Sequence, residues 1–239
     1  MRLSDIYTHL DALSPFATQA SWDNSGLQVG RFHEEIERIY LSLDVDSALL
    51  ENVEEHSLII THHPLIFSGL KQLNFEKYPS RLLETMVRKQ ISLVAMHTNF
   101  DLSHLNRFVA QKLGFTLCEN QAFVGYFDAN CSLDDLILHV KKSLTLPNIR
   151  CVKAKQWIGR CAITTGSGGD LIRDIDADCF LSGDFKYHQA LEAKENHLSL
   201  VDIGHYESEA YFGECLASHL KNLPLKVIMS NSKNPFEYM

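Results

Sequence analysis

The sequence has little of what marks secreted or membrane-spanning proteins. Its six cysteines are scattered and include no Cys-x-x-Cys pair, which argues against a disulfide framework and against a structural zinc knot. No apolar run approaches the roughly 20 residues that cross a bilayer, and the first ten residues lack the continuous apolar segment of a secretory signal. These absences predict a cytoplasmic protein with reduced thiols and no membrane partner.

Positive charge is also scarce. The chain has 22 Lys and Arg residues against 30 Asp and Glu residues, and its formal net charge is -8. We therefore expect no extended nucleic acid as a partner, although a small anionic ligand needs only a local positive site or a metal. The 45% hydrophobic content of the 239 residues is ordinary for a globular protein with one large domain or two smaller lobes.

Strand and helix patterns alternate along the whole chain. Strands are expected near residues 39–45, 57–63, 91–96, 149–153, 160–165, 178–182, 198–203 and 225–229. Helices are expected near residues 4–13, 46–55, 80–90, 103–113, 132–144, 186–196 and 207–220, with a short helix after Gly169. This alternation predicts an α/β fold with two lobes, residues 1–122 and 123–239, and largely parallel sheets.

Two adjacent histidines, His62 and His63, end the strand expected at 57–63. Pro64 lacks a backbone N–H and ends the strand, so both imidazoles can turn into one cleft. Neutral imidazoles suit a borderline metal such as zinc, iron, manganese or nickel. The alternative is that one histidine caps the strand and the other lies on the surface.

Other polar clusters also follow strands. They are His97 with Asp101, the Gly166–Gly169 loop, Ser182-Gly183-Asp184 with His188, and His205 with Glu209. Ligands of open parallel sheets bind outside the carboxyl ends of the strands, so these clusters are expected along one rim. The glycine loop has two interpretations, a phosphate cradle or a tight strand–helix turn.

His205 and Glu209 are four residues apart at an expected helix start, so both side chains face the same way. This spacing suits a metal-ligand pair, and the alternative is a surface ion pair. With Asp101, the candidates amount to three imidazoles and two carboxylates. That set is too large for one catalytic metal with an open position, but it suits two metals about 3.5–4 Å apart.

Three motifs together resemble the signatures of the NIF-three-like dinuclear-metal family, whose members are often named GTP cyclohydrolase 1 type 2 homologues. They are Thr61-His62-His63-Pro64, His97-Thr98-Asn99-Phe100-Asp101 and Gly204-His205-x-x-Ser208-Glu209. Trp22-Asp23-Asn24-x-Gly26-Leu27-x-Val29-Gly30 is similar to the family's N-terminal motif, and Ser182-Gly183-Asp184-x-x-x-His188 to another. One departure is Asp184, where many relatives have Glu.

The resemblance implies two interlinked α/β lobes, a homohexameric ring and two divalent metal ions. The implied ligands are His62, His63, Asp101, His205 and Glu209. The C-terminal part of the second lobe, with His205 and Glu209, would then return to the metal site of the first lobe. The segment Trp22-Asp23-Asn24 would lie under that site, or would simply be a packed turn.

The implied function is a metal-dependent hydrolase acting on a small nucleotide, with GTP cyclohydrolase-type ring opening and formate release as the leading reaction. His97 and His188 are the candidate proton carriers, since an imidazole titrates near neutral pH; the alternative is that they only orient ligands. Two other functions stay open. One is a metal-binding regulatory or interaction protein without turnover, and the other is a metal-dependent phosphoesterase.

Overall fold

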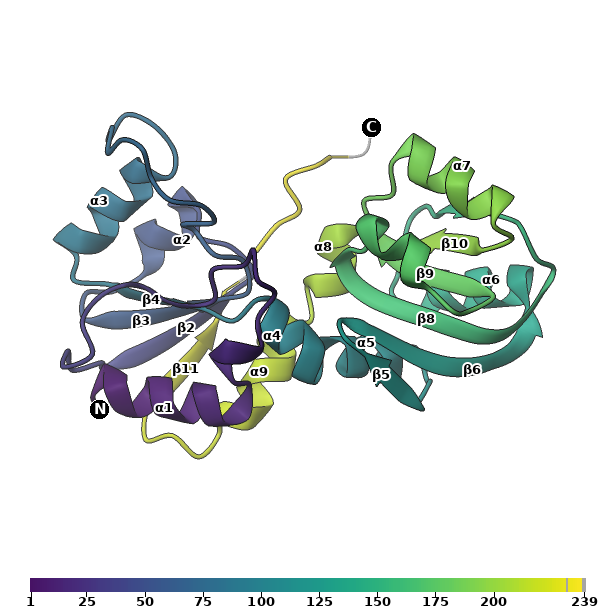
Figure 1. The fold of residues 1–239 in the computed structure, drawn as a ribbon. Helices are drawn as coiled ribbons and strands as arrows, with labels where there is room; N and C mark the ends of the chain where they lie inside the picture. Colours follow the sequence, from purple (N-terminus) through teal and green to yellow (C-terminus); the bar gives the residue numbers. More distant parts are fainter. Residues whose placement is uncertain (231, 238–239) are drawn as a thin grey trace. The chain divides into compact units, whose positions relative to one another are not determined.

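The computed structural model describes residues 1–230 and 232–237 and divides into two compact units (Figure 1). Unit 1 comprises Met1–Phe100 and Phe212–Met239, and unit 2 comprises Asp101–Tyr211. Each unit is a sheet covered by helices, so the expected α/β fold with two lobes is confirmed. Within the described ranges, the helices are too short or too polar to cross a membrane.

The units do not follow the expected division at 122/123. The last strand, β11 (Lys226–Met229), pairs in parallel with β2 (Arg38–Ser42), so the end of the chain belongs to unit 1. Residues from Asp101 onward belong to unit 2, where Asn106 Oδ1 accepts the backbone N–H of Thr165 at 2.8 Å. Both contacts join segments far apart in sequence, and local patterns do not reveal such contacts.

The sheet of unit 1 has the order β1-β4-β3-β2-β11. Besides β2 and β11, its strands are β1 (Gly26–Val29), β3 (Ser57–Thr61) and β4 (Ser92–Ala95). All pairs are parallel except β1 with β4. β1 lies in a segment expected to be turns, because the strand begins at Gly26 and is followed by Gly30, and both glycines have positive φ.

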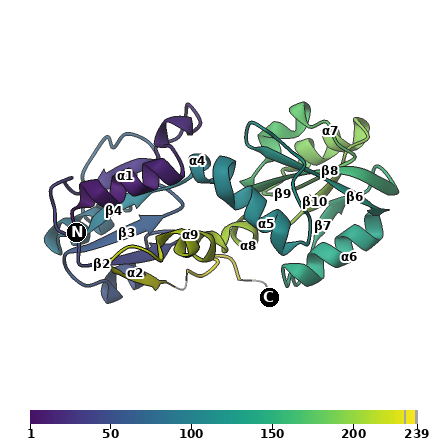
Figure 2. The same cartoon turned by 90° about the horizontal axis from the view of Figure 1, so that it is seen from below.

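Helices cover both faces of this sheet. They are α1 (Leu3–Leu13), α2 (Ser47–Asn52), α3 (Ser80–Arg88), α9 (Phe212–Leu220), and the short η1 (Phe16–Thr18) and α4 (Thr98–Phe100). α2 and α3 lie on one face, with Leu49 and Met86 in a core cluster that includes Ile59 and Leu93. α1 and α9 lie on the opposite face (Figures 1 and 2).

The sheet of unit 2 has the order β5-β6-β8-β9-β10-β7. The strands are β5 (Glu119–Gln121), β6 (Val124–Ser132), β7 (Arg150–Val152), β8 (Trp157–Ser167), β9 (Cys179–Gly183) and β10 (Ser199–Asp202). The centre, β8-β9-β10, is parallel, and the flanking pairs are antiparallel. β5 and β6 were not expected, because β5 is short and exposed and a register shift between Asp128 and Cys131 interrupts the pairing of β6.

The helical segments of unit 2 are the π-helical turn η2 (Asp101–Leu105), α5 (Asn106–Lys112), α6 (Leu133–Ser143), η3 (Gly169–Asp174), α7 (Tyr187–Glu195) and α8 (His205–Glu209). Ser132 caps α6, because its Oγ accepts the backbone N–H of Asp135 at 3.1 Å. The single helix expected over 207–220 is wrong. It is two helices, α8 and α9, because the chain passes from unit 2 to unit 1 between Tyr211 and Phe212.

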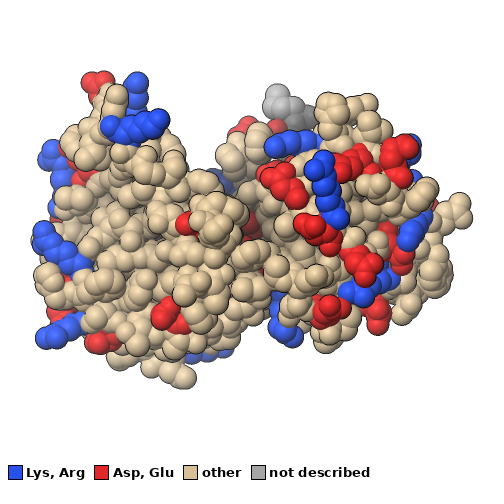
Figure 3. All heavy atoms as spheres, viewed as in Figure 1, with Lys and Arg blue, Asp and Glu red and all other residues tan. Residues whose placement is uncertain are grey.

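Acidic and basic side chains are interspersed over unit 2 on the face shown in Figure 3. Among the described residues visible there, no broad basic area stands out, in keeping with the net charge of -8. The viewed face of unit 1 is largely uncharged, and most of its charged side chains lie toward the edge.

Candidate metal centre

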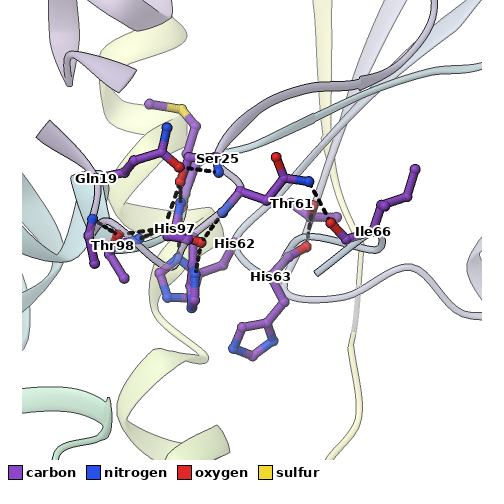
Figure 4. A network of polar contacts seen from close by, with 12 residues as sticks. Gln19, Ser25, Thr61, His62, His63, Ile66, His97 and Thr98 are labelled. Atoms are coloured by element: carbon purple, nitrogen blue, oxygen red, sulfur yellow. Dashed lines mark hydrogen bonds and ion pairs between the residues drawn. The ribbon is translucent and has the colours of Figure 1, made fainter. Parts of the chain in front are cut away.

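The unit 1 histidine set consists of His62, His63 and His97. His62 and His63 follow β3, and His97 follows β4, which pairs in parallel with β3. Parallel neighbours end at the same edge of a sheet, and one ring nitrogen from each histidine lies within 4.8 Å of the others (Figure 4). Thus this edge of unit 1 gathers three imidazoles that could hold a metal ion.

Each of these imidazoles is oriented by an oxygen atom at its Nδ1. The pairs are His62 with the Met96 carbonyl, His63 with Asp44 Oδ1 and His97 with Asp23 Oδ1, each at 2.8 Å. An oxygen that accepts a hydrogen bond there puts the proton on Nδ1 and the lone pair on Nε2. This is the form in which an imidazole binds a metal, and such partners are typical around metal-ligating histidines.

Asp23 is the best-defined of these partners. Its side chain is buried, which by itself raises the pKa of the carboxyl group, but hydrogen bonds from His97, Thr98 and the backbone of Asn24 outweigh that effect. The net result is a lowered pKa, so Asp23 is a carboxylate at neutral pH and a strong acceptor for His97. The Thr98 backbone N–H also donates to Asp23, at 3.1 Å.

The unit 2 set consists of Asp101, His205 and Glu209. His205 Nε2 lies 3.1 Å from Glu209 Oε2, so the expected pairing across one turn of helix is present. Carboxylate oxygens of Asp101 and Glu209 lie within 4.8 Å of one another. An imidazole and two carboxylates therefore converge within unit 2.

The end of β8 positions this set. Thr165 Oγ1 donates to Asp101 Oδ1 at 2.8 Å, and the backbone N–H of Gly166 donates to Ser208 Oγ at 2.9 Å. Gly166 has φ +66°, and a Cβ atom there would lie 2.1 Å from Glu209 Oε1. Only glycine allows this close approach of backbone to carboxylate.

Asp184 orients His205 in the same way as the unit 1 acceptors orient their histidines. Its Oδ2 lies 2.7 Å from His205 Nδ1. The Asp184 backbone is itself in the left-handed region, at φ +59°, directly after β9. The short side chain of Asp184 thus reaches the imidazole of His205 directly.

The Gly166–Gly169 loop matches the interpretation of a tight strand–helix turn. Cβ atoms at Gly168 and Gly169 would lie 2.5 Å from Ser182 Oγ and 2.3 Å from Gln189 Oε1, respectively. The glycines are thus explained by close packing of the turn against neighbouring side chains.

His188 is the one predicted site residue that lies outside both sets. It occupies the first turn of α7, where it is exposed and its ring meets that of Tyr187 at 5.3 Å. Among the described residues, it is in none of the groups able to hold a metal. The catalytic roles of His97 and His188 stay predictions.

Sequence reasoning did not single out three residues that position the donors: Asp44, Met96 and Thr165. Asp44 follows the end of β2, as the histidines follow β3 and β4, so the rule of strand ends could have found it. The Met96 contact uses a backbone carbonyl and therefore leaves no side-chain signal in the sequence.

The donor chemistry fits the metals expected. Imidazole nitrogen and carboxylate oxygen together suit zinc, iron, manganese and nickel. Among the described residues, none of the groups that could hold a metal ion includes a cysteine. The fold and the site together therefore define a class: a two-unit α/β protein with His and carboxylate donors at the ends of parallel strands.

The family model described as Duf34/NIF3 (NGG1p interacting factor 3) matches residues 1–235, and the chain belongs to this family. It is 55% identical to a Campylobacter jejuni protein named GTP cyclohydrolase 1 type 2 homolog, over 100% of both chains. It is 40% identical to the Helicobacter pylori protein named GTP cyclohydrolase 1 type 2, over 98% of both. The resemblance noted from the motifs is confirmed.

Solved structures show the same fold. A Staphylococcus aureus hypothetical protein matches with a TM-score of 0.87 and 26% identity, covering 100% of this chain and 99% of its own. Reduced HcgD from Methanocaldococcus jannaschii matches with a TM-score of 0.80 and 26% identity, over 96% and 97% of the two chains.

Proposed function

We propose that this protein is a dinuclear metal-dependent hydrolase acting on a nucleotide, with GTP cyclohydrolase-type ring opening and formate release as its reaction. The names of its relatives support this reaction. The observation that carries the proposal is the set of imidazoles in unit 1 whose Nδ1 atoms all meet oxygen acceptors, because a site that only packs needs no such arrangement.

In this proposal His62, His63, Asp101, His205 and Glu209 serve one dinuclear centre. This assignment follows the family resemblance, and three imidazoles with two carboxylates suit a pair of metals. When bound, a pair of divalent ions supplies Lewis acidity that brings the pKa of a water molecule toward neutrality.

His97 is the proposed proton carrier. Its Nδ1 proton is held by the Asp23 carboxylate, so Nε2 can take a proton from the attacking water. The buried negative charge of Asp23 stabilises the imidazolium that results. The proton then goes from Nε2 to a ring nitrogen of the substrate as the first carbon–nitrogen bond breaks, which leaves a formamide. A second water hydrolyses this formamide in the same way and releases formate. His188 is the other candidate for proton delivery.

The test is incubation of metal-loaded protein with GTP, following the ultraviolet change of ring opening and the formate produced. Formate from GTP supports the proposal. Phosphate without formate would identify a phosphoesterase, and no turnover with any nucleotide or metal would favour a regulatory, non-catalytic metal protein.

A substitution separates metal binding from proton transfer. His97→Ala should retain metal but lose turnover, by roughly 100-fold or more for a lost acid–base group. His104→Ala, a change at a half-buried histidine outside the metal-donor groups among the described residues, is the matched control. If His97→Ala turns over GTP at the wild-type rate, the role assigned to His97 is wrong.

Assembly and location complete the proposal. As the family resemblance implies, we propose a homohexamer in the cytoplasm. Six chains of 27.2 kDa give about 163 kDa, which light scattering coupled to gel filtration measures directly. A mass of one or two chains would contradict the hexamer.

A further inference from the structure

Two large aromatic side chains lie exposed beside the unit 1 histidine set. Trp22 is 61% exposed and Phe67 is 53% exposed. The ring centroids of Trp22 and Phe67 lie 5.8 Å apart. The Trp22 centroid lies 6.0 Å from that of His97, and the Phe67 centroid lies 6.2 Å from it. Neither ring belongs to the buried core, so core packing does not explain why these two positions carry large aromatic side chains.

The backbone holds the two rings together. Asn24 Nδ2 donates to the Ile66 carbonyl at 2.6 Å, and Figure 4 shows a dashed contact to this carbonyl oxygen. The Ile66 backbone N–H donates to Gln28 Oε1 at 2.9 Å. Gln28 Nε2 in turn donates to the Asn24 carbonyl at 2.6 Å. These three bonds tie the segment of Trp22 to that of Phe67, so the exposed pair is held in place.

Asp23 links the same segment to the metal donors, because it contacts His97 directly. One short stretch, residues 22–24, thus orients a histidine, presents Trp22 to solvent and anchors the segment of Phe67. The two exposed rings are thus held at a fixed position next to the unit 1 histidine set. This arrangement suits a ligand whose flat ring stacks on the aromatic side chains while its reacting atom lies near the histidines.

We propose that Trp22 and Phe67 form a stacking subsite for the purine base of the substrate. This inference rests on the proposed function and adds the residues that recognise the base. Purines stack on aromatic side chains, and loss of one such ring weakens nucleotide binding by roughly 5- to 150-fold. Leu70, Leu73 and Phe75 are also exposed, and a second copy of the chain is the competing occupant of this surface.

Trp22 is itself the reporter for the test. The only other tryptophan is Trp157 in unit 2, which is 62% exposed and outside the proposed machinery. In full-length Trp157→Phe protein, fluorescence therefore comes from Trp22 alone. We expect GMP and GTP to quench this fluorescence in a saturable way, and ribose 5-phosphate and tripolyphosphate to leave it unchanged.

Calorimetry with GMP on variants completes the test. Trp22→Ala and Phe67→Ala should each weaken GMP binding at least 5-fold while the metal content stays at the wild-type value, and Trp22→Phe should recover part of the affinity. Trp157→Ala should bind GMP as the wild type does. Wild-type GMP affinity in both alanine variants would overturn the inference, as would quenching by tripolyphosphate equal to that by GMP.

The outcomes separate this inference from the proposed function. Formate release with unchanged GMP binding in the variants would retain the hydrolase and remove the stacking subsite. Stacking of GMP in protein that makes no formate would retain the subsite and remove the reaction. A lower mass of Trp22→Ala and Phe67→Ala by light scattering, with GMP affinity unchanged, would assign the surface to a second copy and overturn the inference.

Discussion

At the scale of single residues, the donor sets depend on acceptors as much as on ligands. Asp23, Asp44 and Asp184 each place an oxygen 2.7–2.8 Å from the Nδ1 atom of a candidate ligand histidine or of His97. A carboxylate in this position fixes the tautomer and raises the basicity of Nε2. The same aspartates therefore give the most direct test of the site.

Changing Asp44 to Asn should lower metal affinity by about 10- to 100-fold, as expected for an oxygen partner behind a ligating histidine. The amide keeps the shape of the side chain but removes its charge, and it can turn an N–H toward His63. Metal titration followed by elemental analysis measures the change. Asp176→Asn, at an exposed aspartate of unit 2, is the control, and equal affinities in both variants would contradict the role of Asp44.

Changing Gly166 to Ala should displace Glu209, because the new Cβ would lie 2.1 Å from Glu209 Oε1 at a backbone φ of +66°. The carboxylate is the flexible end of a side chain, so it can move; we expect a stability loss of about 1 kcal/mol and a much larger loss of metal. Gly69→Ala, where a Cβ meets nothing within 4 Å, should change neither. Full metal content in Gly166→Ala would count against Glu209 as a ligand.

At the scale of elements, parallel strands place the site. β3 and β4 in unit 1 and β10 in unit 2 end in segments that lead to donors, whereas β8 and β9 end next to residues that position donors. The register of these strands is therefore part of the site. Asp178, which precedes β9, secures the start of β8 by accepting the backbone N–H groups of Gly159 and Arg160 at 2.9 and 3.1 Å.

Changing Asp178 to Asn should reduce the free energy of unfolding by about 1–3 kcal/mol, the usual value for charge-assisted hydrogen bonds. Burial raises the pKa of Asp178, but the ion pair with Lys155 and the two backbone N–H groups outweigh it, so the pKa is lowered below 3.8. Urea unfolding at pH 7 measures the difference, and Asp176→Asn is again the control.

The pH dependence of the same contact has a definite sign. Because folding lowers the pKa of Asp178, its contribution is present above pH 3.8 and is lost as the pH falls through the folded-state value. The stability difference between the wild type and Asp178→Asn should therefore shrink below about pH 4. A difference that grows on acidification would show that another group is responsible.

At the scale of the whole molecule, unit 2 is an insertion in unit 1. The residues on either side of it, Phe100 and Phe212, contact each other with ring centroids 5.3 Å apart. The chain thus leaves and re-enters unit 1 at neighbouring points, which is where inserted domains are tolerated. Each unit also has its own core cluster.

This arrangement predicts that unit 1 folds without unit 2. Replacement of Asp101–Tyr211 by a short Gly/Ser linker should give a protein with a cooperative thermal transition, because Phe100 and Phe212 are already adjacent. It should bind divalent metal more weakly than the full chain, since only two of the five proposed ligands, His62 and His63, remain. Scanning calorimetry and metal titration measure both properties. A non-cooperative transition, or metal affinity equal to that of the full chain, would contradict the prediction.

The sequence by itself determined what short-range rules control. The alternation of strands and helices, the histidines at the end of the β3 segment and the pairing of His205 with Glu209 follow from periodicity and spacing over a few residues. The residue types of the candidate ligands therefore follow from the amino-acid sequence alone.

Only the tertiary structure decided which segments belong together. β11 joins β2, a long sequence separation away, and thereby assigns the end of the chain to unit 1 and splits the expected last helix at the passage between units. The acceptors behind the histidines come from distant turns, as Asp23 does for His97. Such contacts depend on side-chain packing across the fold, which leaves no periodic signal in the chain.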